Sequence, residues 1–251
     1  MGLRLSVTLL TAIPWRGPGD EAATGGDTAP PRAAVAAAMA WAPAVGLLLG
    51  VIASAVLLLA DHPLGAGPLT ASGLAVGSLA LLTRGLHLDG LADLADGLAS
   101  GKPAPAALDI MRRSDIGALG AVTLVLTLLL QVAALSQAES DGHGRGPAAL
   151  VAAVVTGRLA ITWACRRGVP AARPDGLGAL VAGSVRPVTA AAASVATLAA
   201  AAAAAAIWMI SVRTSVTVPS GPMSERRMIS SATGAGLPLP RPSAKSASPS
   251  R

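Results

Sequence analysis

Long apolar stretches restrict the fold of this chain more than any other feature of its sequence. An α-helix needs about 20 predominantly apolar residues to cross the hydrocarbon core of a bilayer. Most of the stretches reach or approach that length, and one of 14 residues would need its neighbours to complete a span; they are 33–60, 69–82, 116–138, 148–165 and 188–210. The sequence therefore predicts an all-α, polytopic helical integral membrane protein, with about five transmembrane helices plus interfacial and cytoplasmic helices.

The overall composition agrees with a membrane protein. Hydrophobic residues make up 53% of the 251 residues and charged residues only 13%, whereas soluble domains carry about 25% charged residues. The net charge of +6 does not indicate nucleic acid, because the aromatic residues that stack on bases are only 2% of the chain. We expect a lipid bilayer and no nucleic acid among the partners.

Basic residues alternate between the connections that join the apolar stretches. The connection 61–68 has none and 139–147 has one, whereas 83–115 and 166–187 carry four each: Arg84, Lys102, Arg112 and Arg113, and Arg166, Arg167, Arg173 and Arg186. Cytoplasmic loops carry an excess of Lys and Arg. The pattern therefore predicts a multi-pass protein of the cell (inner) membrane, with 83–115 and 166–187 together in the cytoplasm.

Three regions follow from this pattern. Residues 1–32 are predicted to form an N-terminal interfacial segment and a flexible connector, and residues 33–210 a transmembrane domain with the loop 83–115 on its cytoplasmic side. Residues 211–251 are rich in Ser, Pro and Arg, which predicts a disordered tail. The single cysteine excludes an internal disulfide, and no paired Cys/His spacing indicates a zinc site.

An acidic segment stands out against this apolar background. Asp89, Asp93 and Asp96 are spaced i, i+4 and i+7, which places all three carboxylates on one face of a helix, and His87 lies two residues before the first. Such like charges repel one another unless a cation lies among them. Mg²⁺ prefers one or two carboxylates together with phosphate oxygens of a substrate. A solvated acidic helix face without chemistry is the alternative.

Positively charged residues offer candidate anion sites. Ser114 and Asp115 precede an apolar stretch, where they can cap a helix, and Arg112 and Arg113 beside them suit either a membrane border or an anion site at that helix N-terminus. Both interpretations stay open. Arg158 lies inside an apolar stretch, where a charged side chain is costly and needs a partner.

Two segments of the sequence follow a family pattern, TRGLHLDGLADLADGL (83–98) and ALDIMRRSDIGALGAVTLVL (107–126), with weaker support from LTAIPW (10–15), WAPAVGLLLG (41–50) and GRLAITWACRRGVPAARPDGLG (157–178). Together they give a resemblance to the cobalamin synthase family, adenosylcobinamide-GDP ribazoletransferase. It implies an integral membrane, Mg²⁺-dependent transferase of the last stage of cobalamin (vitamin B12) biosynthesis. The reaction implied joins adenosylcobinamide-GDP to α-ribazole or its 5′-phosphate and releases GMP.

The resemblance also implies roles for particular residues. The family's acidic motif corresponds here to His87, Asp89, Asp93 and Asp96. On this basis the three aspartates are the expected ligands of one or two Mg²⁺ ions, and one of them or His87 is the expected base. The expected phosphate-binding residues are Arg84, Arg112, Arg113, Ser114, Asp115, Arg158 and Arg173.

The chain departs from the family pattern near its end. It lacks the Gly-Gly-x-Thr-Gly-Asp type of motif that family members carry before a last hydrophobic span, and the tail 211–251 is expected to replace the family C-terminus. The active site would then be incomplete. Two other functions compete with this one: a Mg²⁺-dependent phosphotransferase of the CDP-alcohol type, and a cation transporter.

Overall fold

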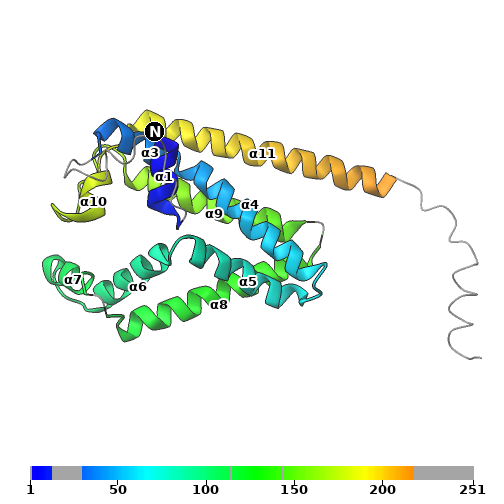
Figure 1. Cartoon of the computed structure of the whole chain (residues 1–251), viewed down its shortest axis with the longest axis horizontal. Helices are drawn as coiled ribbons and strands as arrows, with labels where there is room; N and C mark the ends of the chain where they lie inside the picture. The colour runs from blue at the N-terminus through cyan, green and yellow to red at the C-terminus, as the bar shows by residue number, and fades with distance from the viewer. Residues whose placement is uncertain (1, 13–29, 114, 143, 218–251) are drawn as a thin grey trace, which may run out of the picture. The chain divides into compact units, whose positions relative to one another are not determined.

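The structure is a computed structural model that describes residues 2–12, 30–113, 115–142 and 144–217, with side chains described as far as residue 203. Among these residues there is no strand, only an isolated bridge between Arg166 and Val185. The helices, labelled in Figure 1, are α1 (Gly2–Leu10), α3 (Arg32–Ala40), α4 (Ala42–Asp61), α5 (Gly67–Leu82), α6 (Leu86–Ala99), α7 (Ala104–Ile110), α8 (Ala118–Ser140), α9 (Arg145–Ala164), α10 (Gly176–Val181) and α11 (Pro187–Thr217). The chain divides into the units Met1–Ala204 and Ala205–Arg251.

Three helices of the described residues are long and apolar enough to cross a membrane: α4, α8 and α9. Helices α5 and α6 pass the same test only together, across a bend of 89°, which makes four spans if the pair counts as one. Helix α11 continues to Thr217, and its portion Pro187–Ala203 is a shorter apolar helix. The predicted polytopic all-α membrane protein is thus confirmed, with three or four candidate spans in the described residues instead of the five stretches predicted. Residues 218–251 of the predicted tail and 13–29 of the predicted connector lie outside the described residues.

The apolar stretch 33–60 forms two helices, not one, because of a proline. Pro43 in the first turn of α4 has no N–H, so the carbonyl of Met39 loses the donor that a continuous helix would supply. The buried hydroxyl of Thr162 on α9 donates to that carbonyl at 2.8 Å. A side chain from a distant helix therefore satisfies the backbone at the break between α3 and α4.

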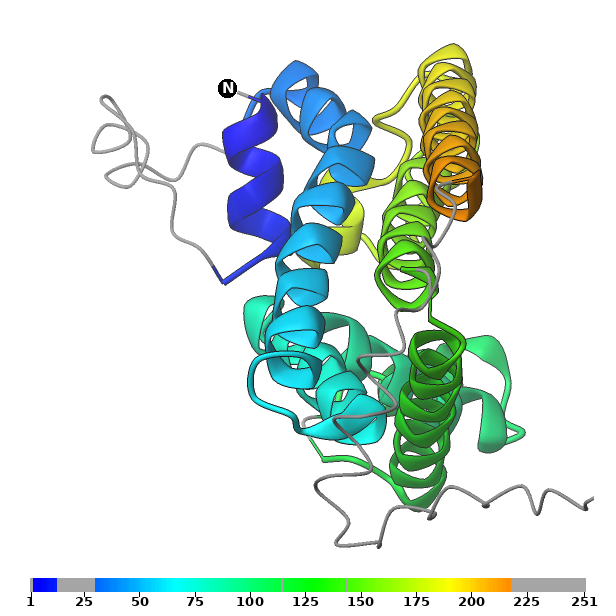
Figure 2. The ribbon, with the colours of Figure 1, turned by 90° about the vertical axis from the view of Figure 1, so that its right-hand side faces the viewer.

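Helix α4 packs most extensively against α9, and small residues allow the close approach (Figures 1 and 2). A Cβ atom on Gly46 would lie 3.0 Å from Cβ of Arg158, and one on Gly50 would lie 3.0 Å from Cα of Val151. Because lipid is as apolar as a leucine side chain, helices in a membrane associate through such close van der Waals packing. These glycines therefore set the position of Arg158 relative to α4.

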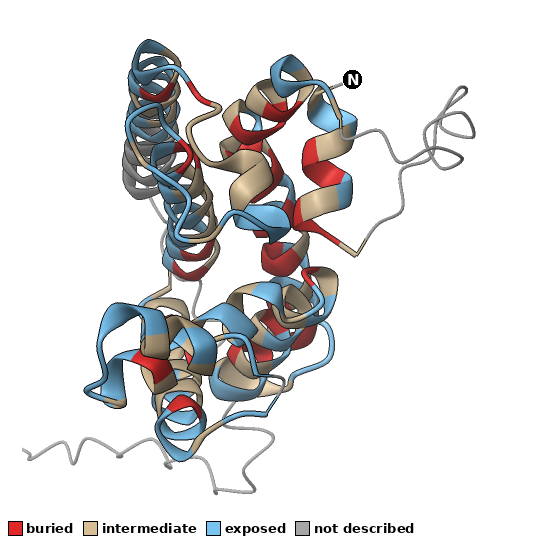
Figure 3. Ribbon diagram, turned by 90° about the vertical axis from the view of Figure 1, so that its left-hand side faces the viewer, coloured by how far each residue is buried: buried red, intermediate tan, exposed pale blue. Residues whose placement is uncertain are grey.

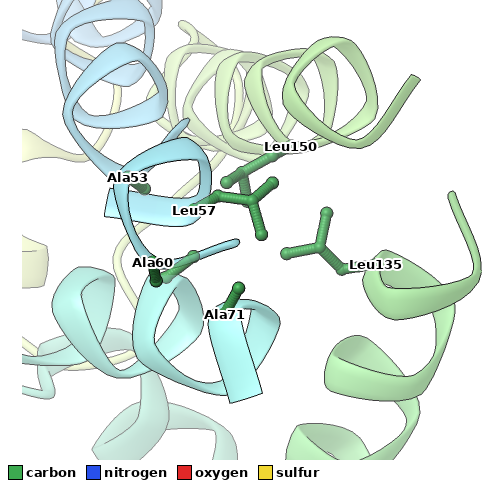
Figure 4. Packing of buried hydrophobic residues seen from close by; sticks show 7 residues of the cluster. Ala53, Leu57, Ala60, Ala71, Leu135 and Leu150 are labelled. Atoms are coloured by element: carbon green, nitrogen blue, oxygen red, sulfur yellow. The ribbon is translucent and has the colours of Figure 1, made fainter. Parts of the chain in front are cut away.

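The buried residues lie where helices face one another (Figure 3). One cluster joins four helices through Leu57 of α4, Ala71 of α5, Leu135 of α8 and Leu150 of α9 (Figure 4). By contrast, α8 exposes a row of large apolar side chains, Val122, Val125, Leu126, Leu129 and Leu130. In a bilayer such a face contacts lipid.

The connection between α5 and α6 turns sharply at Arg84 and Gly85. Both residues have positive φ angles, 54° and 66°, and the N–H of Gly85 donates to the carbonyl of Ala80 at 2.8 Å. Glycine adopts this left-handed conformation without the steric penalty that other residues meet. With the 89° bend, α6 lies along the membrane plane when α5 follows the membrane normal. We therefore treat α4, α8 and α9 as the membrane-spanning helices, and α6 as lying outside them.

Candidate active site

Asp96, the last of the three aspartates on α6, is engaged by the start of α8. Its Oδ2 accepts a hydrogen bond from the backbone N–H of Gly117 at 2.7 Å, and its Oδ1 accepts one from the N–H of Gly120 at 2.8 Å. These are N–H groups that a helix N-terminus leaves without an internal partner, and its positive end favours a carboxylate. Asp96 therefore fastens α6 to α8.

Asp89 and Asp93 lie one turn apart on α6 and accept no hydrogen bond from the described residues. Asp89 is exposed, and Asp93 is half-buried. Burial, and then the charges of Asp89 and Asp96, raise the pKa of the Asp93 carboxyl, while Arg173 opposes this rise. The predicted phosphate ligand Arg173 thus lies near enough to Asp93 to act on its charge.

A cavity of about 670 Å³ opens beside the first turn of α6. Its polar lining includes two of the predicted site residues, Arg84 and Asp89, together with Thr8 and Thr11 of α1. Its apolar lining includes Leu124 of α8 and Leu177 of α10. The cavity therefore joins the predicted acidic motif to the N-terminal segment that contains α1 and to α8 and α10 of the transmembrane domain.

His87 and Arg158 each bury a polar atom that has no hydrogen-bond partner among the described residues: Nδ1 of His87 and Nε of Arg158. Burial, and then the positive charge of Arg158, lower the pKa of His87 to about 4. His87 is therefore neutral at physiological pH. The buried, unpaired Nε of Arg158 and Nδ1 of His87, on side chains that interact through charge, suit an anion, because buried polar atoms without partners carry a large desolvation cost.

The remaining predicted phosphate ligands lie after α7. Arg112 forms an ion pair with Asp175, the residue before α10, at 3.2 Å, and both side chains are exposed. Arg113 and Asp115 are also exposed, and Ser114 lies outside the described residues. This ion pair and the effect of Arg173 on Asp93 bring the connections 83–115 and 166–187 to the same side of the domain, as the alternation of basic residues predicted.

The residues on α6 fit a magnesium ion that is shared with a substrate. Carboxylate oxygens are the ligands that Mg²⁺ prefers, and it commonly takes only one or two from protein together with phosphate oxygens. Asp89 and Asp93 offer such oxygens, whereas Asp96 already accepts two backbone hydrogen bonds. Among the described residues, the three aspartates are not a group whose ligand atoms all approach within 4.8 Å. The predicted Mg²⁺ site on all three stays a prediction.

Comparison with known proteins identifies the family. The family model for Cobalamin-5-phosphate synthase matches residues 2–234. This chain belongs to the cobalamin-5-phosphate synthase family. Two relatives named adenosylcobinamide-GDP ribazoletransferase are that of Frankia casuarinae, 47% identical over 191 residues (73% of this chain, 64% of the relative), and that of a Nocardioides species, 38% identical over 182 residues (72% and 73%). A third, from Azorhizobium caulinodans, is 42% identical over 137 residues (55% and 51%).

The family match confirms the resemblance found in the sequence and extends beyond residue 178, where the quoted motifs end. The chain spans 64% of the length of the Frankia relative and about half of the length of the Azorhizobium relative. No solved structure matches the chain.

Sequence reasoning missed several residues at the site of this family member. Thr8, Thr11 and Leu177 line the cavity, and Asp175 pairs with Arg112. No local pattern marks them, since each reaches the site from an element distant in sequence. Gly120 was one signal in the sequence: a glycine in the first turn of an apolar helix indicates a close approach, here by the Asp96 carboxylate.

Proposed function

We propose that this member of the cobalamin-5-phosphate synthase family is a membrane transferase that joins adenosylcobinamide-GDP to α-ribazole or its 5′-phosphate and releases GMP. One observation carries the proposal: the cavity beside α6 is lined by Asp89 of the acidic motif and by Arg84, an expected phosphate-binding residue. The name that the relatives carry, adenosylcobinamide-GDP ribazoletransferase, supports the proposal.

In the proposed reaction, a hydroxyl oxygen of the ribazole attacks the cobinamide-linked phosphorus of the diphosphate. A new P–O bond forms, the bond to the bridging oxygen breaks, and GMP leaves. The displacement requires charge neutralisation, alignment and removal of the hydroxyl proton. The base candidates are the three aspartates and His87. Burial and the neighbouring carboxylates raise the pKa of Asp93, which strengthens that carboxylate as a proton acceptor, whereas burial and Arg158 lower the pKa of His87 to about 4, which weakens its imidazole.

Other residues bind and position the diphosphate. Arg158 and the imidazole of His87 have unpaired buried atoms that can donate to phosphate oxygens, and Arg84 lines the cavity. Asp89 and Asp93 would hold Mg²⁺, which supplies neutralisation of the phosphate charge. Asp96 is a positioning residue in this proposal, because it holds α6 against α8.

We further propose that the site faces the cytoplasm of the cell membrane. The basic connections 83–115 and 166–187 carry four Lys or Arg residues each, and the Arg112–Asp175 ion pair lies between them. An excess of basic residues is typical of cytoplasmic loops.

The test is an assay of membranes that contain the full chain, with adenosylcobinamide-GDP, α-ribazole and Mg²⁺. We expect formation of the cobalamin product and of GMP, and we expect Asp93→Asn to lower the rate by about a hundredfold or more. The matched control is Asp109→Asn, which changes an exposed carboxylate on α7. Absence of product in wild-type membranes, or an equal rate in Asp93→Asn, would contradict the proposal.

A further inference from the structure

A second group of metal-binding side chains lies at the far end of α8. Asp61 is the last residue of α4, His62 follows it, and Glu139 is the penultimate residue of α8. One ligand atom from each lies within 4.8 Å of the others, and Nδ1 of His62 lies 3.8 Å from Oδ2 of Asp61. This arrangement mixes an imidazole nitrogen with two carboxylates.

The packing beneath the group fixes its geometry. Leu57 and Leu135 belong to the same buried cluster, and each lies one helical turn before a ligand, Asp61 and Glu139 respectively (Figure 4). Glu139 also lies directly against Gly146 in the first turn of α9, where a Cβ atom would overlap its Oε2. The ends of α4 and α8 and the start of α9 therefore meet at this point.

The unpaired negative charges of the group favour a bound cation. Oε2 of Glu139 is buried and has no hydrogen-bond partner among the described residues. No Lys or Arg of the described chain forms an ion pair with Asp61 or Glu139, and the nearby Arg145 pairs with Asp141 at 3.5 Å. Two neighbouring carboxylates without a basic partner repel each other, and a buried unpaired oxygen is costly.

We propose that Asp61, His62 and Glu139 form a binding site for a divalent transition metal ion of the zinc type. Zn²⁺ binds His nitrogen and Asp or Glu oxygen at about 2.0–2.2 Å, and a water molecule can complete a tetrahedral set. Two ligand atoms on one such ion lie within about 4.4 Å of each other. Only a small rotation of the side chains is required, and His62 is exposed and free to make it.

The proposed site is separate from the acidic motif on α6. Gly120, which contacts Asp96, and Glu139 are at opposite ends of α8, roughly 30 Å apart at 1.5 Å per residue. The ligands come from two places that are distant in the chain, the end of α4 and the end of α8, so no local spacing in the sequence marks the proposed site. The inference does not depend on the proposed enzymatic function, since its test measures metal binding.

The experiment is a titration of the purified full chain, in detergent and stripped of metal, with Zn²⁺, and it uses an affinity tag without histidine. Isothermal titration should show one tight equivalent. Loss of an outer-shell partner commonly costs 10–100-fold in metal affinity, so losing a ligand in Glu139→Gln or His62→Gln should weaken binding by roughly tenfold or more. Zn²⁺ should also raise the melting temperature of the wild type more than that of Glu139→Gln.

Two controls make the result decisive. Asp141→Asn alters a carboxylate two residues from Glu139 and should retain wild-type affinity. The double variant Asp89→Asn/Asp93→Asn should also retain it, whether or not the transferase activity exists. The proposal is overturned if the wild type binds no Zn²⁺, if Glu139→Gln binds it equally well, or if the double variant abolishes binding.

Discussion

The carboxylate of Asp96 on α6 accepts a hydrogen bond from the backbone N–H of Gly120 on α8 at 2.8 Å. Helix α8 has no side-chain cap of its own at Gly117, so a residue from another helix supplies it. The contact connects the acidic helix of the candidate site to a membrane-spanning helix. It makes the position of α6 sensitive to the residues at the start of α8.

Gly120→Ala is expected to destabilise the protein. A Cβ atom at this position would overlap the Asp96 carboxylate and approach the carbonyl of Ala92 to 2.9 Å. The steric cost, about 1–3 kcal/mol, outweighs the gain of about 0.5–1 kcal/mol that alanine normally brings to a helix interior. Thermal unfolding in detergent measures the change.

The matched control for Gly120 is Gly157→Ala on α9. A Cβ atom there would meet no heavy atom within 4 Å among the described residues, so the variant should be neutral or slightly stabilised. Equal melting temperatures for the two variants would contradict the contact between Asp96 and Gly120.

Asp93→Asn is expected to stabilise the metal-free protein at pH 7 while it abolishes activity. Burial and the neighbouring carboxylates raise the pKa of Asp93 above its value in the unfolded chain. A raised carboxyl pKa contributes stability at low pH, and this contribution is lost as the pH rises through the folded pKa. The ionised form therefore destabilises the fold at pH 7.

Melting temperatures with and without Mg²⁺ test whether the ionised Asp93 carboxylate destabilises the fold. In EDTA, Asp93→Asn should melt above the wild type at pH 7, and the difference should shrink as the pH falls toward about 4. Added Mg²⁺ should raise the melting temperature of the wild type more than that of the variant. A lower melting point for Asp93→Asn in EDTA would show that the carboxylate is held by partners instead of repelled.

Hydropathy and residue spacing predict the helical class, the membrane setting and the acidic helix α6 well, because these properties depend on local sequence. The i, i+4, i+7 pattern places the three aspartates on one face, but it does not distinguish Asp96, which contacts α8, from Asp89, which lines the cavity. That difference depends on which helix packs beside α6. The group of Asp61 and Glu139 is hidden from the sequence for the same reason.

Thr162→Val is expected to destabilise the protein at the junction between α3 and α4. The hydroxyl of Thr162 donates to the Met39 carbonyl, which lacks the helical N–H donor four residues on because that residue is Pro43. Loss of that hydrogen bond at a buried site should cost about 1–3 kcal/mol. Thr156→Val, on the same helix, removes a hydroxyl that donates only to Ala152 of its own helix, and it should change the melting temperature little.

Arg158→Ala is expected to raise the pKa of His87 from about 4. Burial is the larger cause of the lowered pKa and the charge of Arg158 the second, so removing that charge should move the pKa only part of the way toward the ordinary value. In the wild type the unfolded chain takes up the proton first, so the protein should lose stability as the pH falls from about 6.5 to 4. In the variant this loss should be smaller.

Nuclear magnetic resonance of histidine-labelled protein measures the pKa directly, with His87→Gln to assign the signal. The control is Arg166→Ala, which removes an exposed arginine beyond the end of the same helix. It should leave the titration of His87 unchanged. An unchanged titration in Arg158→Ala would mean that the two side chains do not interact, because a nearby guanidinium would act on the imidazole through its charge. That result would remove the support for a shared anion site.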